Sequence, residues 1–590
     1  MYRTGGVAAH RSGNSWFQAR ARQSSINHPL LRRPNFTDHL SERDTSGCPN
    51  VIVLDDESDD RNDGEEELFI TGSRNVAPPQ VQKVVDIAQI QRVARGPVKL
   101  EPGCDVELTD QTFLRIVEYL PNTGERGSIR GYRLLYQNHW ELFMPERKHE
   151  LVQLIKINDE MEVGYVTTTV PVGEIVRNCT IVFTNQLYMN LHYRKHVEAY
   201  TGEDHEQAVY FCRWTSADSN VPTEERDPRG PPLSGRIDHL QARQADNGAL
   251  VTPKGQIKFQ ISDREVRRQW RGMETSTSRR KTFADAFCGA GGTSAGAFQA
   301  GLRLKFAVDF DKVAIETYRN NFGLTGTHPL CCDVSDFIKI ASMSPQRYVV
   351  DFLHISPPCQ PFCGANRNPN PEKNKQDLDS FSKVSSLLEV CKPRIVTLEE
   401  AKSLTDIDKR EHFRNLICGF IKKAYSIQWK AVELAKYGVP QTRHRTIIIA
   451  SGPGERLPAF PKPTHGTEPG LLPIPSIIST LDAIPVDAPQ QNERSEMRKT
   501  MPPYPGHGLC QTIMTSDKRH HYHPSGTRRF NIREYASLQT FGHYFVFSGR
   551  KSQMLRQIGN AVPPLFAETL FTHLKAALIA ADEAEDREEP

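Results

Sequence analysis

The sequence predicts an α/β fold for the carboxyl-terminal half of the chain. Strand-like runs lie at 282–287 and 304–310, and each is followed by a segment with helical periodicity. A third apolar run, 348–355, ends in two prolines, which terminate a strand because neither donates a backbone hydrogen bond. This alternation is typical of a parallel sheet, whose ligands bind beyond the carboxyl ends of the strands.

The overall composition limits the class of protein. The chain has 590 residues, enough for two to four domains. Hydrophobic residues make up 38% and charged residues 25%, which favours a soluble protein with some weakly folded sequence. The net charge of +3 is too small to argue for nucleic acid by itself, so any basic surface must be local. No run of 18 apolar residues occurs, and we expect no membrane span.

The 12 cysteines have no regular spacing, and we expect no signal peptide. We therefore expect reduced thiols in an intracellular protein. The paired CxxC motifs of a structural zinc site are missing, so the sequence predicts no metal.

Residues 1–94 are predicted to be disordered. The first 35 residues hold six arginines and no acid, which suits a basic arm or, less well, a mitochondrial presequence. Further on, the apolar run 51–54 is followed by a strongly acidic stretch that ends at 60. Residues 51–60 resemble a SUMO-interacting motif, which would add a strand to the edge of a sheet in SUMO. The alternative is an incidental apolar patch in an acidic tail.

Residues 95–215 predict a small all-β module. Short runs rich in β-branched and aromatic residues, such as 113–120 and 129–136, are separated by turn residues. The last run, 209–214, is similar to the final strand of bromo-adjacent homology (BAH) domains, and this resemblance implies chromatin proteins as partners. Residues 216–280 are polar and contain five prolines, so they are interpreted as a linker with a short helix near 262–273.

A glycine-rich turn, 288–292, joins the first predicted strand of the α/β half to its helix. Glycines at this place let a ligand approach the backbone and the helix N-terminus closely. Asp309 follows Gly289 by twenty residues, a spacing that suits a carboxylate bound to a ribose hydroxyl pair. Asp333 follows the next strand and could accept a hydrogen bond from an adenine amino group. Either acid alone is better explained as a solvated loop residue, but their order favours a cofactor site.

Five motifs then occur in one order and spacing that resemble the cytosine-5 methyltransferase family. They are Phe287-Cys288-Gly289-Ala290-Gly291, Pro357-Pro358-Cys359-Gln360, Gln441-Thr442-Arg443-His444-Arg445, Arg533-Glu534 and the stretch 557–563. The resemblance implies a Rossmann-like, S-adenosylmethionine-dependent domain over 281–580. It also implies a nuclear enzyme that acts on double-stranded DNA after the target base has flipped out of the duplex.

The resemblance assigns the chemistry to four residues. Cys359 would be the nucleophile, because its thiolate can add to ring carbon 6 of cytosine and activate carbon 5. Glu399, at the end of the apolar run 395–398, matches the glutamate that protonates or hydrogen-bonds ring nitrogen 3. Arg443 and Arg445 match arginines that hold the carbonyl oxygen of the base and position the catalytic loop. The alternative for these arginines is a surface ion pair.

The remaining assignments concern the cofactor and the segments around the site. The residues expected to bind S-adenosylmethionine are Phe287, Gly289, Gly291, Asp309, Phe310, Asp333, Pro358, Asn560 and Val562. The polar loop after Gln360 is expected to act as a lid. A short target-recognition region spans about 450–527, and residues 581–590 are expected to form an acidic tail.

Two positions depart from the family pattern. Glu400 replaces the usual asparagine, which places a second carboxylate next to Glu399 in the sequence, and Cys363 stands where serine is usual. With the short recognition region and the β-module, these departures resemble the fungal RID-like branch, linked to repeat-induced mutation or premeiotic methylation of repeats. Two alternatives stay open: a chromatin factor that methylates poorly, and a tRNA methyltransferase, although the Cys-Phe-Thr motif of that branch is missing.

Overall fold

A computed structural model describes most of the chain beyond residue 79. The model does not describe a few stretches of one to four residues inside the ranges given in the next sentence. The main described ranges are 80–86, 98–121, 127–136, 144–158, 161–187, 209–218, 234–358, 382–491, 506–515 and 521–588. The SUMO-motif candidate at 51–60 lies outside them. Within 1–94, strand β1 (Gln82–Asp86) pairs with β11 (Asn247–Thr252), so this part of the region predicted as disordered is ordered.

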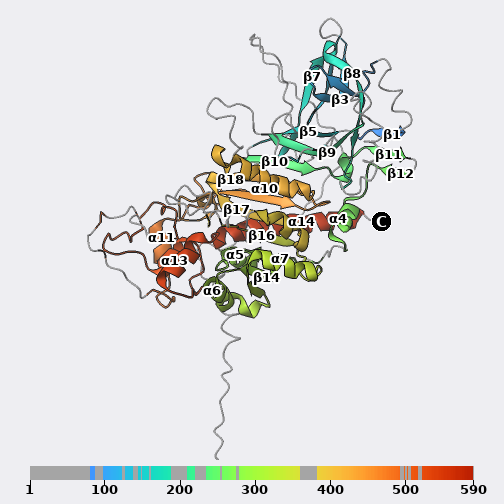
Figure 1. The fold of residues 1–590 in the computed structure, drawn as a ribbon. Coiled ribbons are helices and arrows are strands. Elements are labelled where there is room, and N and C mark those ends of the chain that lie inside the picture. The colour runs from blue at the N-terminus through green and yellow to red at the C-terminus, as the bar shows by residue number, and fades with distance from the viewer. Residues whose placement is uncertain are drawn as a thin grey trace, which may run out of the picture. The chain divides into compact units, whose positions relative to one another are not determined.

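The α/β prediction is confirmed by a mixed sheet in the carboxyl-terminal half (Figure 1). The strand order is β15-β14-β13-β16-β17-β19-β18, in which the first five are parallel and β19 runs antiparallel to both of its neighbours. The strands are β13 (Thr282–Ala286), β14 (Arg303–Asp309), β15 (His328–Cys331), β16 (Phe352–Ile355), β17 (Ile395–Ala401), β18 (Ser426–Glu433) and β19 (His444–Ser451).

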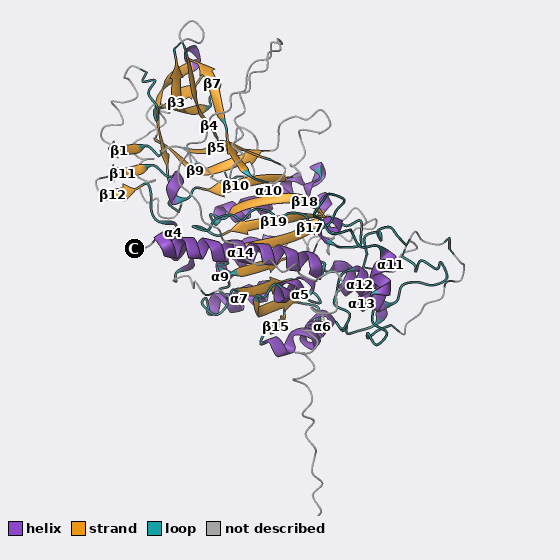
Figure 2. Ribbon diagram, turned by 180° about the vertical axis from the view of Figure 1, so that it is seen from behind, coloured by secondary structure: helices purple, strands orange, loops and turns teal. Residues whose placement is uncertain are grey.

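Helices cover both faces of this sheet. One face carries α5 (Gly292–Gln299), α6 (Lys312–Phe322) and the long α14 (Pro564–Glu588), which crosses the strands in Figure 2. The other face carries α7 (Val334–Met343), α9 (Val384–Cys391) and α10 (Arg410–Lys422). The contact of α14 with α5 is close, because a Cβ at Gly296 would lie 2.5 Å from the Cβ of Ala567. The C-terminal helix therefore packs directly behind the glycine-rich turn.

The described residues of 95–215 form strands, as their composition predicts. They are β2 (Asp105–Leu108), β3 (Phe113–Leu120), β4 (Ser128–Tyr136), β5 (Glu150–Ile157), β6 (Val163–Tyr165), β7 (Thr167–Pro171), β8 (Ile175–Phe183) and β9 (Val209–Asp218). Buried Arg115 links this module to the following segment, since it donates to Asp105 at 2.8 Å and to Asp246 at 2.6 Å. The assignment of the module to the BAH class stays a prediction.

The segment 216–280 differs from the linker that its composition predicts. Strand β10 (Ser234–His239) pairs with β9 on one side and with β18 on the other, so the β-module and the catalytic sheet are continuous (Figure 1). A Cβ at Gly235 would overlap the ring of Trp429, which explains a glycine at this crossing. Strands β11 and β12 (Gly255–Lys258) and helix α4 (Asp263–Arg271) follow. The prolines between β9 and β10 had obscured these short elements.

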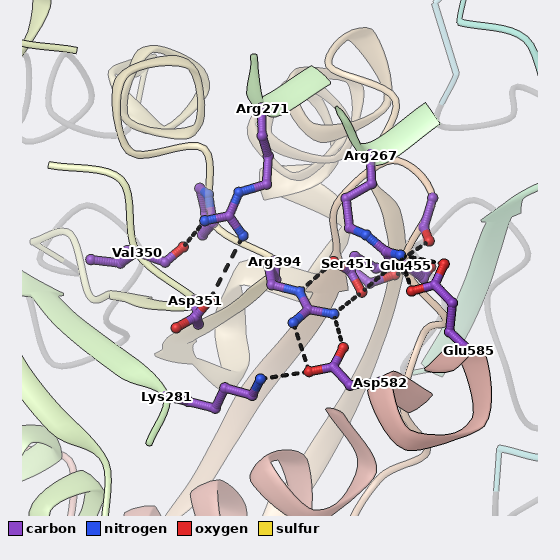
Figure 3. Close-up of polar contacts among 12 residues, drawn as sticks. Arg267, Arg271, Lys281, Val350, Asp351, Arg394, Ser451, Glu455, Asp582 and Glu585 are labelled. Atoms are coloured by element: carbon purple, nitrogen blue, oxygen red, sulfur yellow. Dashed lines mark hydrogen bonds and ion pairs between the residues drawn. The ribbon is translucent and has the colours of Figure 1, made fainter. Parts of the chain in front are cut away.

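The acidic tail expected at 581–590 is also wrong for residues up to 588, because α14 continues to Glu588. Asp582 is 4% exposed and accepts from Lys281 at 2.5 Å. It also pairs with Arg394 at 2.5 Å, and Arg394 pairs with Glu455 at the same distance (Figure 3). Acidic composition suggested solvation, whereas these carboxylates are balanced by buried cations.

We call this group the amino-edge cluster, because Lys281, Asp351 and Arg394 directly precede strands β13, β16 and β17. Its members are Arg267, Arg271, Lys281, Asp351, Arg394, Glu455, Asp582 and Glu585 (Figure 3). Four cations face four carboxylates, contributed by α4, the strand starts, the turn after β19 and the end of α14. The cluster therefore connects the segment before the sheet to the last helix after it. No helix in the described part of the chain is long and apolar enough to cross a membrane.

Candidate active site

The candidate site lies at the carboxyl edge of the parallel strands, opposite the amino-edge cluster. Strand pairing puts Asp285 of β13 beside His354 of β16, and His354 beside Thr397 of β17. Side chains two residues apart on a strand share a face. Phe287, Ser356 and Glu399 therefore follow this row at the edge of the sheet, where α/β proteins bind their ligands.

The glycine-rich turn has the backbone that a close ligand approach requires. Phe287 has φ +63° and Gly291 has φ +91°, and Gly291 is the N-cap of α5. A Cβ at Gly291 would lie 2.6 Å from the ring of Phe322, so glycine is needed there on both counts. The space beside Gly289 is open, because nothing lies within 4 Å of its Cβ position.

Asp309 meets this turn, as its spacing in the sequence predicts. The backbone N–H of Gly289 donates to one Asp309 oxygen at 2.8 Å, and that of Asp311 donates to the other at 2.8 Å. Burial raises the pKa of the Asp309 carboxyl, against the lowering effect of these two bonds. The next residue, Phe310, is 67% exposed, an unusual exposure for a large apolar ring.

Asp333 lies on the neighbouring strand end. It is exposed and caps α7, where it accepts from the N–H of Ser335 at 2.7 Å. The backbone N–H of Cys332 donates to the carbonyl of Asp309 at 3.1 Å, so the two acids belong to adjacent chain segments. An open glycine turn, an exposed aromatic ring and carboxylates on successive strand ends together fit a nucleoside-type cofactor such as S-adenosylmethionine.

The segment after α13 (Lys551–Asn560) closes the other side of the turn. A Cβ at Gly292 would overlap the carbonyl oxygen of Val562, so the two segments are in direct contact. Val562 is buried, whereas Asn560 is exposed at the end of the helix. Val562, one of the nine residues expected to bind the cofactor, therefore contacts the turn directly.

Glu399 is held by both arginines that follow the turn before β19. Its Oε1 lies 2.8 Å from Arg445 Nε and 3.7 Å from Arg443 Nη2. This arrangement arises because β19 pairs antiparallel with β17. The side chain of Arg445 is 17% exposed, whereas that of Arg443 is 2% exposed. Arg443 also donates to the carbonyls of Gly559 and Ala561, at 3.3 and 3.2 Å.

The second carboxylate, Glu400, is separated from Glu399 by the sheet itself. Adjacent residues of a strand point to opposite faces. Glu400 is fully buried, and its Oε2 accepts from the N–H of Ala401 at 3.0 Å. The repulsion suggested by adjacency in the sequence is therefore reduced by the opposite directions of the two side chains.

Cys359, Gln360 and the expected lid lie outside the described residues. The described chain reaches Pro358, which follows β16 and lies at its carboxyl end. Residues that the motifs did not identify as part of the site are His354 and Thr397, which bond to each other at 2.8 Å below this edge. The available indication was a single histidine in an otherwise apolar strand. Among the described residues, no cluster of His, Cys, Asp or Glu is placed to hold a metal ion.

The fold and the site define an α/β protein of the methyltransferase type, with a cofactor turn and a carboxylate–arginine group on one sheet edge. The chain belongs to the C-5 cytosine-specific DNA methylase family, whose model matches residues 281–505 and 486–576 and so spans half of the chain. Family membership thus supports the expectation drawn from the five motifs.

Relatives of this family match the same half of the chain. A DNA (cytosine-5)-methyltransferase, PliMCI of Paracentrotus lividus, is 32% identical over 190 residues, which are 31% of this chain and 12% of that protein. The type II methyltransferase M.Sau96I of Staphylococcus aureus is 29% identical over 319 residues, or 47% of this chain and 72% of the bacterial protein. The chain thus spans about an eighth of the first relative. Among solved structures, the Dnmt2 methyltransferase of S. pombe covers 51% of this chain at 14% identity, with a TM-score of 0.39.

Proposed function

We propose that the protein transfers a methyl group from S-adenosylmethionine to carbon 5 of cytosine in double-stranded DNA. The observation that carries the proposal is the position of Glu399. It lies at the carboxyl end of β17, 2.8 Å from Arg445, next to the strand that leads into Pro358 and Cys359. The names of the relatives and the family model support the same reaction.

Carbon 5 of cytosine is a poor nucleophile. The reaction therefore needs a thiolate that first adds to the ring and activates this carbon. The Cys359 thiolate forms a bond to ring carbon 6, while Glu399 protonates or hydrogen-bonds ring nitrogen 3. The electron pair of the former double bond then makes carbon 5 nucleophilic. S-adenosylmethionine, when bound, supplies the electrophilic methyl group. A base removes the proton from carbon 5, and the bond between sulfur and carbon 6 breaks, which regenerates the free cysteine and the aromatic ring.

The two arginines have different tasks in this proposal. Arg445 is partly exposed and forms an ion pair with Glu399, so it is the arginine able to reach the carbonyl oxygen of a flipped base. Arg443 is buried against the carbonyls of Gly559 and Ala561. It therefore positions Glu399 and the segment before Val562 and does not touch the base. This division refines the expectation that both arginines act together.

The cofactor is assigned to the edge formed by the glycine turn and the next two strand ends. Asp309 would bind the ribose, Phe310 would pack against the adenine ring, and Asp333 would accept from its amino group. Pro358, Asn560 and Val562 would complete the site from the neighbouring segments. The chemistry of these side chains suits a nucleoside with a positively charged sulfur, since carboxylates lie on the same edge.

The wider setting is proposed from the sequence resemblance alone. In this setting, the protein is nuclear, belongs to the RID-like branch and acts on repeated DNA. Its β-module binds chromatin proteins, and residues 51–60 bind SUMO. A chromatin factor with the same fold and weak activity is the second candidate. The observation in its favour is Glu400 in place of asparagine, although the opposite directions of Glu399 and Glu400 reduce its weight.

Labelled methyl transfer from S-adenosylmethionine to DNA and to tRNA tests the proposal, with Cys359→Ala as the control. We expect incorporation into DNA that the variant abolishes. No incorporation into unmethylated, hemimethylated or repeat duplexes would contradict the enzymatic proposal. A covalent adduct on DNA that contains 5-fluorocytosine, lost in Cys359→Ser, would identify the nucleophile independently.

A further inference from the structure

We propose that His354 is a positioning residue of the methyl-transfer site. It fixes the turn that leads into Cys359 relative to the strand that carries Glu399. The inference rests on the proposed function but adds a residue that touches neither the base nor the cofactor. Its evidence is the pair of hydrogen bonds that the imidazole makes to two different catalytic segments.

The surroundings of His354 are apolar. It is 2% exposed in the fully buried strand β16, and the ring of Phe571 lies edge-on at 6.4 Å between centroids. A buried polar ring without hydrogen-bond partners is costly, because it has lost its bonds to water. Both ring nitrogens of His354 therefore need partners, and both have them.

The two partners lie on different segments. Nδ1 is 2.8 Å from the hydroxyl of Thr397 on β17, and Nε2 is 2.8 Å from the hydroxyl of Ser356. A hydroxyl can donate or accept, so either neutral tautomer satisfies both bonds. Burial lowers the pKa of His354 to about 3, so the ring is neutral at physiological pH. His354 therefore contributes geometry and neither charge nor a proton.

The register shows why this geometry matters. Ser356 comes three residues before Cys359, and Thr397 comes two residues before Glu399. The imidazole is thus a bridge between the nucleophile segment and the carboxylate segment, one step below the reacting groups. The backbone bond at this point is long, since the N–H of Ser356 donates to the carbonyl of Ala286 at 3.3 Å. On the other side, the paired register of β16 with β17 ends at Ile355 and Leu398, so the side-chain bridge adds a constraint beyond the paired strands.

A histidine that merely stabilises the core predicts a different outcome from a positioning histidine. Loss of a core contact lowers the stability of the protein without a selective effect on the chemical step. Loss of a positioning contact slows attack by the thiolate, because displacement of a reacting group by about 1 Å can cost roughly 100-fold in rate. The hydroxyl of Thr397 gives the sharper test, since valine and serine separate its shape from its hydrogen bond.

The experiment compares Thr397→Val, Thr397→Ser and His354→Phe with the wild-type chain. His239→Phe is the matched control, because His239 is 5% exposed and burial likewise lowers its pKa to about 3, but it lies on β10 outside the catalytic segments. The measurements are single-turnover methyl transfer at saturating S-adenosylmethionine and DNA, adduct formation on 5-fluorocytosine duplexes, ligand affinities and the thermal midpoint.

We expect Thr397→Val and His354→Phe to slow both rates by about 10- to 100-fold with unchanged ligand affinities. Thr397→Ser should retain the wild-type rate, and His239→Phe should lower only the thermal midpoint. If Thr397→Val lowers the thermal midpoint but keeps the wild-type rates, His354 is a structural residue and the proposal is overturned.

A separate readout keeps the inference distinct from the proposed function. The rate of Cys359 alkylation by iodoacetamide, followed by peptide mass spectrometry, reports the thiol environment without methyl transfer. If the wild-type protein neither methylates DNA nor forms the adduct, the proposed function fails. Altered alkylation in Thr397→Val and His354→Phe, but not in Thr397→Ser, would still support the bridge, and unaltered alkylation in all three would contradict it.

Discussion

The two edges of one sheet carry charged residues in opposite ways. At the amino edge, four cations and four carboxylates lie largely buried and form ion pairs with one another (Figure 3). At the carboxyl edge, Asp333 is exposed, Phe310 faces solvent, and Arg445 is only partly buried against Glu399. The same residue types are therefore closed into a network at one edge and left accessible at the other.

The comparison separates charged residues that stabilise the fold from charged residues that remain available for chemistry. A buried ion pair has no capacity left for a ligand, and removal of one partner leaves an uncompensated charge. The Glu399 carboxylate is buried, but its partner Arg445 is partly exposed, so this pair can still be reached by a substrate. Variants at the amino edge should therefore change stability, and variants at the carboxyl edge should change rate.

Glu399→Gln should have the largest effect, and the effect should be on rate. Glutamine keeps the shape of the side chain but cannot protonate ring nitrogen 3. Loss of a general acid lowers the rate by about 10²- to 10⁴-fold. Single-turnover methyl transfer measures the effect, and urea denaturation should show a smaller loss of stability than a variant of the amino-edge cluster causes, because the Arg445 partner of Glu399 is partly exposed. A variant that unfolds more easily but turns over normally would remove the distinction between the two edges.

Arg394→Met should have the largest effect at the opposite edge, and the effect should be on stability. Arg394 is fully buried and pairs with both Glu455 and Asp582. Breaking such a group costs about 3–5 kcal/mol in the free energy of unfolding, because the carboxylates stay buried without that partner. Urea denaturation measures the loss. The rate of methyl transfer by the folded fraction should stay unchanged.

The matched control is Lys339→Met, which breaks the exposed pair of Lys339 with Asp336 on α7. This pair is in solvent, so the denaturation midpoint should not move. Equal shifts for Arg394→Met and Lys339→Met would mean that the amino-edge cluster is no more important than a surface ion pair.

Asp582→Asn should cost less than Arg394→Met, about 1.5–3 kcal/mol, because asparagine loses the charge but keeps an oxygen that accepts from Arg394 and Lys281. The double variant with Arg394→Met should cost less than the sum of the two single changes, since Asp582→Asn removes one of the uncompensated charges. Urea denaturation of all three variants gives the coupling energy. Strict additivity would show that Asp582 and Arg394 do not act as one network. Asp336→Asn on the exposed pair is the control.

The sequence predicts a feature of this fold well when its residues lie close together along the chain, and poorly when they lie far apart. The glycine turn, Asp309 and Glu399 could be predicted because each lies within a short motif beside a strand. The amino-edge cluster could not, since Lys281, Arg394 and Asp582 are far apart in the sequence and each resembles a solvated surface charge. The end of α14 was expected to be an acidic tail from 581 for the same reason, because its balancing cations, Arg394 and Lys281, lie 188 and 301 residues away.

Local composition also gives a wrong prediction of secondary structure where a short element is stabilised by its neighbours. Strand β10 has six residues and is ordered by pairing with β9 and β18, which no local pattern shows. His354 is a similar case at the site, because its role depends on hydroxyls of Ser356 and Thr397 that face it only after the strands align. Motifs therefore predict the reacting groups, and the pairing of strands adds the residues that we propose support them.

The smallest expected effect is a difference in pH dependence between the two edges. Burial raises the pKa of Asp285, in the row below the site, from its usual 3.8 to about 7, against the hydrogen bond from Ser294. Its contribution to stability is therefore complete below pH 4 and is lost as the pH rises through 7. Asp582 has the opposite sign: burial alone would raise its pKa, but Arg394 and Lys281 outweigh it and lower the pKa. Its contribution is lost only as the pH falls below about 4.

Asp285→Asn should therefore flatten the decline in stability between pH 5 and 8, by at most about 1.4 kcal/mol per pH unit, because asparagine does not titrate. Asp582→Asn is the matched control: its curve over the same range should run parallel to the wild-type curve, displaced downward. Urea denaturation at pH 5, 6, 7 and 8 measures both slopes. Parallel curves for Asp285→Asn would mean that this carboxyl is already ionised in the folded protein. The carboxyl edge would then differ from the amino edge in exposure alone.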